Sequence, residues 1–316
     1  MKEVQIEKNE SGQRFDKFLQ KYLKEATKGF IYKMLRKKNI CLNGNKAAGN
    51  EMLRQGDIVT IYFSDETLSK FRGEAEEKRY PVTELDIVYE DSEIALINKK
   101  VGMLSQKARP EDVSLAEYFP GYLQEKGEWQ PGGAFTPGIC NRLDRNTSGL
   151  VIGGKSLAGL QKMSELLRER TMDKYYVTIV EGVMRKPSFL KGYLAKDEVD
   201  NKVTIFEEDG KGRSYIETGY EPLCNNGEYT YLRVHLITGK THQIRGHLSS
   251  IGHPVLGDIK YGGHSYHGLR SYLLHASEIV FPKLEEPFTS ISEKKFVALP
   301  PQKFLNIKEK LFGDKE

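Results

Sequence analysis

The sequence is poor in cysteine and contains no long apolar run. Its three cysteines, Cys41, Cys140 and Cys224, lack C-x-x-C spacing, which argues against a disulfide framework and a structural zinc site. No stretch approaches the roughly 18 consecutive apolar residues that a membrane span needs, and the chain's first residues are too polar for a signal peptide. We therefore expect a globular, cytoplasmic protein outside the membrane.

A large net charge is also missing, because 48 basic residues nearly balance 44 acidic ones over 316 positions. The charge is nevertheless concentrated. Between Arg14 and Arg54, eleven Lys and Arg residues accompany three acidic ones, a local net charge of +8, so the other 275 residues sum to −4. The densest group lies at the end of a predicted helix and consists of Lys33, Arg36, Lys37 and Lys38.

This basic group has two interpretations. Cations at a helix C-terminus are favoured by the helix dipole, so a solvated helix end is one of them. Four cations within six residues exceed what that effect requires. We therefore favour a surface that contacts nucleic-acid phosphates.

The spacing of apolar residues predicts a small N-terminal domain of two helices on a small sheet. Helical spacing appears within residues 15–22 and 30–35, and strand-like runs follow at 40–42 and 58–63. Residues 64–79 lose this periodicity and become mostly charged, as a tether between domains would. The predicted boundaries are 1–64 for the first domain, 65–80 for the linker and 81–316 for a larger domain.

The larger domain mixes strand and helix patterns without a regular βαβ repeat, which predicts an α+β fold with a mixed sheet. The patterns indicate helices at residues 156–170 and 243–251, and a long surface loop at 118–138. Strand-like runs occur at 87–89, 94–98, 177–180, 229–235 and 278–281.

Two motifs in this domain do not carry the chemistry that they suggest. Residues 149–156 match G-x-x-x-x-G-K-[ST], but polar residues precede the motif and its interior is apolar, so we expect a buried strand that leads into a helix. His242, His247 and His253 lack metal-ligand spacing, so we expect no metal site and hydrogen bonding of His242 within its own segment.

Three other segments place charged or polar groups in a structural context. The first contains Asp144 between Arg142 and Arg145, whose positive charges would keep the carboxylate ionised. The second, residues 174–177, opens a strand, and the third, residues 238–248, is a glycine turn that leads into a helix. Each segment alone is compatible with a purely structural role.

Together the three segments resemble the signature of the RluA-type pseudouridine synthases, in particular the RluC/RluD-like members. The resemblance covers about Leu85 to Pro282, in the family's order, and the basic first domain resembles the ribosomal-protein-type RNA-binding domain of many members. The matching residues are Arg142-Leu143-Asp144, Thr147-Ser148-Gly149, Lys174, Tyr176, Thr238 to Arg245, Gly252-His253-Pro254, Gly257-Asp258, Tyr261-Gly262 and Leu274-His275-Ala276.

The resemblance implies isomerisation of uridine to pseudouridine in RNA, without cofactor or metal. It implies that Asp144 is the catalytic carboxylate, that Arg245 pairs with it and that Tyr176 stacks on the target base. Arg142 would enter the RNA stack that the flipped uridine leaves. Lys33, Arg36, Lys37 and Lys38 would bind the RNA backbone, and ribosomal RNA, of the large subunit, is favoured over transfer RNA.

One residue departs from the family pattern. Many relatives have His before the Arg-Leu-Asp, where this chain has Asn141, which cannot titrate near neutrality. This difference leaves open a non-catalytic RNA-binding protein, such as a ribosome assembly factor on the same scaffold. Separately, the sequence does not distinguish two routes for Asp144, covalent attack on the sugar and assistance to base departure and deprotonation. A monomer is the default expectation.

Overall fold

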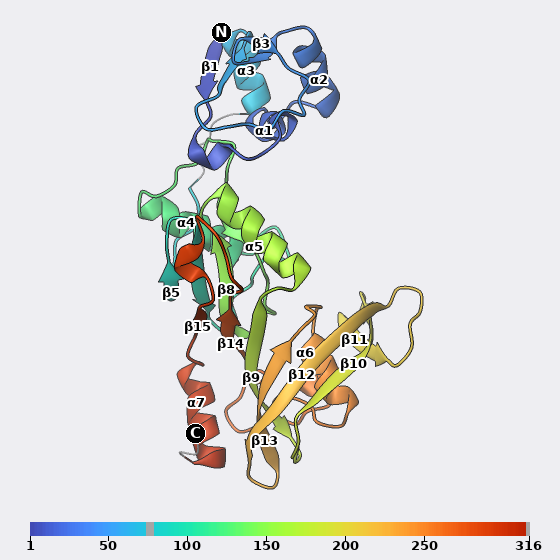
Figure 1. The fold of residues 1–316 in the computed structure, drawn as a ribbon. Helices are drawn as coiled ribbons and strands as arrows, with labels where there is room; N and C mark the ends of the chain where they lie inside the picture. Colours follow the sequence, from blue (N-terminus) through green and yellow to red (C-terminus); the bar gives the residue numbers. More distant parts are fainter. Residues whose placement is uncertain (74–78, 314–316) are drawn as a thin grey trace.

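The computed structural model describes residues 1–73 and 79–313, and Figure 1 shows them arranged around two separate sheets. The smaller, antiparallel sheet has the strand order β1-β4-β2-β3. Its strands are β1 (Lys2–Gln5), β2 (Ile40–Leu42), β3 (Asn45–Lys46) and β4 (Ile58–Ile61). The helices beside it are η1 (Lys8–Glu10), α1 (Phe15–Tyr22), α2 (Lys28–Arg36) and α3 (Asp65–Arg72).

The apolar faces of α1 and α2 form the core of this N-terminal unit, as their spacing predicts. Phe15, Phe18 and Ile31 are completely buried against the sheet. The Thr27 hydroxyl accepts a hydrogen bond from the backbone N–H of Phe30 and begins α2. The polar faces of both helices are left exposed.

The predicted linker at 65–80 is wrong in its first half, because Asp65–Arg72 form helix α3. The Ser64 hydroxyl caps this helix at the N–H of Thr67, Leu68 is buried in the N-terminal core, and the ring of Phe71 packs on that of Phe30. Leu68 and Phe71 are the only apolar residues of this helix, which is too few to produce a recognisable helical spacing in the sequence. The prediction for residues 74–78 lies outside the described part of the chain.

The larger sheet is mixed and has eleven strands, which confirms the predicted α+β fold with a mixed sheet. Its main order is β11-β10-β12-β13-β9-β14-β8-β6-β5, with β15 beside β14 and β7 beside β8. The strands are β5 (Ile87–Glu90), β6 (Ile94–Lys99), β7 (Gly138–Ile139), β8 (Ser148–Gly154), β9 (Asp173–Glu181), β10 (Ser188–Asp197), β11 (Lys202–Phe206), β12 (Ser214–Asn225), β13 (Tyr229–Leu236), β14 (Leu274–Val280) and β15 (Lys295–Val297).

The helices of the larger unit pack on this sheet. They are α4 (Leu115–Glu125), α5 (Leu157–Glu169), α6 (Gln243–Ser250), η2 (Ile259–Tyr261), η3 (Thr289–Ile291) and α7 (Gln302–Phe312). The loop predicted at 118–138 is therefore helical at its start, because Ser114 and Glu117 form a capping box and Phe119 and Leu123 are buried. None of the described helices combines the length and apolar character that crossing a bilayer requires.

Strand β8, near the centre of the large sheet, is buried along its whole length. In β8, Leu150 and Ile152 join the core on one face and Val151 the core on the other, as alternation in a buried strand requires. Gly149 has φ +112°, and a Cβ atom there would lie 2.2 Å from the carbonyl oxygen of Ala276 in the parallel strand β14. The residues that precede β8 are thereby held at a fixed place beside β14.

Specific side-chain contacts join the N-terminal unit to the larger unit. Lys8 pairs at 2.7 Å with Glu93, whose side chain is 1% exposed, and Arg72 donates to the carbonyl of Gly132. Ala134 is buried in the N-terminal core although it belongs to the larger unit's loop. The N-terminal sheet is thus anchored on the end of the large sheet that carries α4 and α5 (Figure 1).

Candidate active site

A cleft of about 700 Å³ lies between the body of the large sheet and the segment that leads into α6. Its walls come from the turn before β8, the start of β9, the end of β13 and the first residues of α6. Asp144 is the one acidic residue among the described lining residues. The cations that line the cleft number nine: Lys107, Arg142, Arg145, Arg168, Arg170, Lys174, Lys196, Lys240 and Arg245.

Asp144 stands on the turn before β8, with its carboxylate 27% exposed to the cleft. The carbonyl of Asp144 accepts the N–H of Thr147, which closes the turn. The Ser105 hydroxyl bonds both the N–H and the carbonyl of Leu143, at 3.0 and 2.7 Å. The backbone on the N-terminal side of Asp144 is therefore fixed by a segment almost forty residues away in the chain.

Lys99 fixes the other side of the same turn. This lysine is 1% exposed, and its ammonium group donates to the carbonyls of Lys100, Met103 and Arg145 at 3.2, 2.9 and 3.2 Å. Burial lowers the pKa of Lys99 to about 8, an effect that the nearby carboxylate of Asp144 opposes. Lys99 thus contributes a positive charge and three backbone contacts to the turn that carries Asp144.

Arg245 approaches Asp144 from the first turn of α6. Its Nη1 lies 3.5 Å from Asp144 Oδ2, while Nε and Nη2 bind both oxygens of the buried Asp258 at 2.6 and 2.9 Å. The rings of Tyr272 and Tyr261 lie 4.0 and 4.8 Å from the guanidinium carbon. Burial opposes the charge of Arg245, but Asp258 and Asp144 raise its pKa above the ordinary value, so the cation persists.

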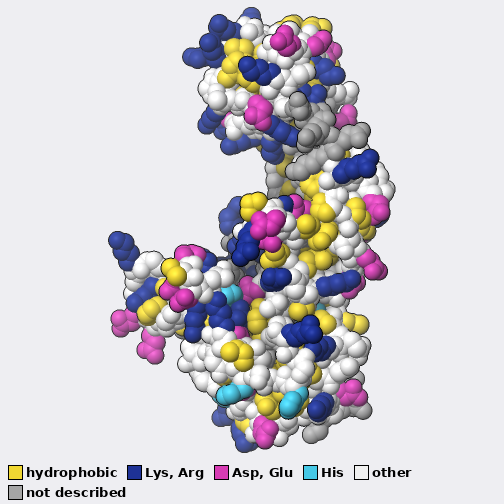
Figure 2. All heavy atoms as spheres, turned by 180° about the vertical axis from the view of Figure 1, so that it is seen from behind, with side chains coloured by type: hydrophobic (Ala, Val, Ile, Leu, Met, Phe, Trp, Pro, Cys, Tyr) yellow, Lys and Arg dark blue, Asp and Glu magenta, His cyan; other side chains and the backbone are white. Residues whose placement is uncertain are grey.

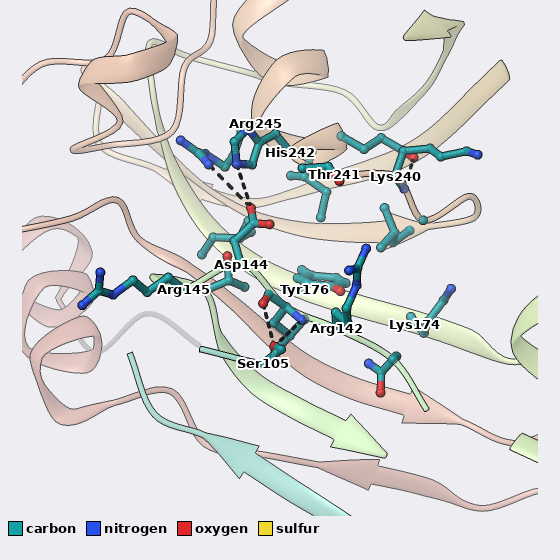
Figure 3. A pocket seen from close by; sticks show the side chains of 18 of the residues that line it. Ser105, Arg142, Asp144, Arg145, Lys174, Tyr176, Lys240, Thr241, His242 and Arg245 are labelled. Carbon is teal, nitrogen blue, oxygen red and sulfur yellow. Dashed lines mark hydrogen bonds and ion pairs between the residues drawn. The ribbon is translucent and has the colours of Figure 1, made fainter. Parts of the chain in front are cut away.

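His242 also faces Asp144, as Figure 3 shows. Its Nε2 lies 3.7 Å from Asp144 Oδ2, and its Nδ1 lies 2.8 Å from the hydroxyl of Tyr261. The expectation that His242 bonds within its own segment is therefore wrong. His247 and His253 bond instead to Thr218 and to the carbonyl of Glu181, and no described group of three or more side chains could hold a metal ion.

Tyr176 contributes an aromatic wall to the cleft. It follows Lys174 by two residues on β9, so both side chains face the same side of the strand, and its ring is 7% exposed. Burial, with a smaller contribution from Asp144, raises the pKa of Tyr176. The hydroxyl therefore keeps its proton at neutral pH, and the ring offers a flat apolar surface near the carboxylate.

The structure separates Arg142 and Arg145 from the carboxylate that they flank in the chain. Arg142 donates to Gln106 at 3.0 Å, and Arg145 donates to the carbonyl of Gly102 at 3.2 Å. In Figure 3 the side chain of Arg145 points away from Asp144, and Arg142 lies beside Tyr176. The prediction that these two arginines are the cations paired with Asp144 is wrong, because Arg245, distant in sequence, forms that ion pair.

Asn141 has a structural task at the edge of the cleft. Its side-chain oxygen accepts the N–H of Ile152 at 2.8 Å, and its amide nitrogen lies 3.4 Å from the carbonyl of Leu150. Both contacts are to the backbone of β8, which they join to the segment before it. Asn141 therefore holds the backbone of β8 through its amide group, and this structural role does not require a titratable side chain.

The basic residues of the N-terminal unit lie apart from this cleft. Lys33, Arg36, Lys37 and Lys38 occupy the end of α2 and the turn after it, all are exposed, and none lines the cleft. Figure 2 shows Lys and Arg side chains on the side of the N-terminal unit that carries α1 and α2, and again around the indentation beside the lobe of β10–β12.

Four residues that the motif analysis did not single out for the site complete its geometry. Lys99, Ser105 and Tyr272 lie outside the motifs that suggested the site, and Asp258 was noted only as part of a motif. The only local sign of a role for Lys99 is its position directly after the strand-like run 94–98. The finished arrangement presents one carboxylate, held by a permanent cation, in a cleft of positive potential that suits a polyanionic substrate.

Comparison with known protein families agrees with this chemistry. The family model described as RNA pseudouridylate synthase matches residues 93–250. A ribosomal large subunit pseudouridine synthase C of Vibrio vulnificus is 31% identical over 297 residues, covering 90% of both chains. Another of that name, from Haemophilus ducreyi, is 30% identical and covers 93% of this chain and 90% of its own.

Solved structures agree in fold. Human RNA pseudouridylate synthase domain containing 4 matches with a TM-score of 0.58 at 21% identity, over 72% of this chain and 92% of that protein. The matched range contains Asp144, Tyr176 and Arg245, all of which line the cleft. The chain therefore belongs to the RluA-type family of pseudouridine synthases and is an isomerase that acts on RNA.

Proposed function

We propose that this enzyme converts specific uridines of large-subunit ribosomal RNA to pseudouridine, with Asp144 as the catalytic carboxylate. The observation that carries the proposal is the ion pair of Asp144 and Arg245 in a cleft where every other charged lining residue described is a cation. The choice of ribosomal RNA is supported by relatives named as large-subunit enzymes, which align over about nine-tenths of the chain.

Each lining residue then has a task in the reaction. Arg245 pairs with the Asp144 carboxylate and orients it, because its own orientation is fixed by Asp258. Tyr176 stacks on the uracil base that has left the RNA helix. Arg142, exposed at the mouth of the cleft, fills the space in the RNA stack that this base vacates.

The N-terminal unit supplies affinity rather than chemistry in this proposal. We assign residues 1–64 to an RNA-binding domain, extended by α3 to Arg72, and residues 81–316 to the catalytic domain. Lys33, Arg36, Lys37 and Lys38 contact the phosphate backbone, because their exposed charges lack any ion pair with a described residue.

The experiment that tests this proposal maps pseudouridine in ribosomal and transfer RNA from cells with and without the gene. Adduct formation at pseudouridine followed by primer extension locates each modified base. We expect one or a few sites in large-subunit ribosomal RNA to disappear, and to return when purified protein is added to that RNA. Loss of sites in transfer RNA alone would overturn the choice of substrate.

A further inference from the structure

The ring of His242 lies between a tyrosine hydroxyl and the Asp144 carboxylate. Its side chain is 9% exposed, with Nδ1 2.8 Å from Tyr261 Oη and Nε2 3.7 Å from Asp144 Oδ2. His242 is also the residue before α6, and its φ of 54° and ψ of 15° belong to the left-handed region that few residues other than glycine adopt. This uncommon backbone conformation brings the ring to the carboxylate.

The hydroxyl of Tyr261 determines where the histidine carries its proton. That oxygen already accepts the backbone N–H of Val203 at 2.9 Å. Burial raises the pKa of Tyr261, although Val203 and Arg245 act in the opposite direction, so the hydroxyl is protonated at neutral pH. Among the described residues, the acceptor in reach of this proton is Nδ1 of His242.

An imidazole that accepts at Nδ1 carries its single proton on Nε2. The N–H then points toward Asp144 Oδ2, whereas the other tautomer would direct a lone pair at an anionic oxygen. Burial lowers the pKa of His242 and disfavours the doubly protonated ring. The other charged groups around it are Arg245 and Lys260, which act in the same direction, and Asp144 and Asp258, which oppose it.

We propose that His242 is a positioning residue for the Asp144 carboxylate, held by Tyr261 as the neutral Nε2–H tautomer. Its N–H and Nη1 of Arg245 approach the same oxygen, Oδ2, which fixes the rotation of the carboxylate and leaves Oδ1 without a described protein partner. A neutral donor orients the carboxylate without adding a second positive charge that would weaken it as a nucleophile or base. The inference rests on the catalytic role proposed for Asp144.

The tautomer can be measured without any activity. In protein labelled with ¹⁵N at histidine, we expect Nε2 of His242 to show the chemical shift of a protonated nitrogen near neutral pH, and Nδ1 that of an unprotonated one. The variant His242→Gln assigns the signals by removing them. In Tyr261→Phe, which keeps the ring beside Arg245, the two tautomers should mix. A proton on Nδ1, or on both nitrogens, in the wild-type protein would overturn the proposal.

The positioning role is tested by single-turnover kinetics at saturating RNA. The 3.7 Å contact between His242 and Asp144 is longer than a hydrogen bond, and we expect it to shorten to one when RNA fills the cleft. His242→Leu should then lower the rate constant about 10- to 100-fold, the range for a lost hydrogen bond to a charged group, while the Kd for RNA stays within about twofold. His242→Gln, whose amide nitrogen reaches close to the position of Nε2, should recover most of the rate. His253→Gln, outside the cleft, is the matched control and should react at the wild-type rate.

The outcomes separate the two proposals. Equal rate losses in His242→Leu and His242→Gln, or a weaker Kd at an unchanged rate, would show that the ring does not act by donating to Asp144. Retained turnover in Asp144→Asn would instead overturn the role of Asp144, and the proposal for His242 with it, even where the tautomer is as expected.

Discussion

The two cation-rich regions of this enzyme differ in what surrounds their charges. In the cleft, Arg245 is 5% exposed and contacts two carboxylates and two aromatic rings. At the end of α2, the four cations are exposed and form no ion pair with a described residue. Short-range contacts in a dry site fix geometry, whereas exposed charges act over the Debye length and are screened by salt. The first arrangement suits chemistry and the second suits affinity.

The largest expected effect is on turnover in the cleft. Asp144→Asn keeps the shape of the side chain but removes the negative charge, so we expect the single-turnover rate constant to fall by about 10³-fold or more. The Kd for RNA should change little, because the affinity comes from cations that bind phosphate and Asp144 is not one of them. Pseudouridine formed per enzyme on large-subunit ribosomal RNA measures the rate. A rate near that of the wild type would exclude Asp144 from the reaction.

The stability of two variants compares a fully buried ion pair with a partly buried one. Asp258→Asn removes the carboxylate that makes two close hydrogen bonds with the buried guanidinium of Arg245, which costs about 3–5 kcal/mol of unfolding free energy. The matched control is Glu278→Gln, because Glu278 makes the same two-bond contact with Arg233, whose side chain is 31% exposed. That variant should lose about 1 kcal/mol or less. Equal losses in equilibrium denaturation would contradict this account.

The pH dependence of stability tests the buried charge of Lys99. Its pKa is about 8 in the folded protein against 10.5 for a free lysine, so between these pH values the unfolded chain binds more protons. The free energy of unfolding should therefore rise by about 2–3 kcal/mol from pH 8 to 10.5 through this group. The rise should be absent from Lys99→Met, and an identical pH dependence in both proteins would show that Lys99 does not titrate there.

The smallest expected effect concerns the exposed region. Lys37→Gln with Lys38→Gln should weaken RNA binding and reduce the slope of log K against log salt concentration by about two, one for each lost phosphate contact. The matched control is Lys186→Gln with Lys310→Gln, since both residues are exposed and lie outside the cleft and α2. Binding titrations at several salt concentrations provide the measurement. An unchanged slope would mean that the end of α2 is a solvated surface.

Local patterns were sufficient for the parts of the fold whose apolar residues recur regularly. The strand 148–154 and the helix 157–169 follow from Leu150, Val151 and Ile152 and from the glycine pair after them. Helix α3 was missed because Leu68 and Phe71 are its main apolar marks. The β10–β11 hairpin was missed because β11 is the edge strand of the sheet and few residues of either strand are buried, which weakens the alternation.

In the site, too, residues within sequence motifs could be predicted, whereas contacts between residues far apart in the chain could not. Asp144, Tyr176 and Arg245 were expected because their motifs resemble a known family. The sequence predicts Arg142 and Arg145, the neighbours of Asp144 in the chain, as its ionic partners. In the fold the ionic partner is Arg245, and the ring of His242 lies beside the same carboxylate oxygen. Lys99 and Ser105 act through backbone contacts across about forty residues, and no local pattern reports such contacts.

The most direct test measures both regions in one experiment, as the rate constant at saturating RNA and the Kd for Asp144→Asn and for Lys37→Gln with Lys38→Gln. We predict a crossed result: the first variant loses its rate and keeps its Kd, and the second loses affinity and keeps its rate at saturation. Turnover by Asp144→Asn at the wild-type rate would contradict the assignment of the chemistry to this cleft.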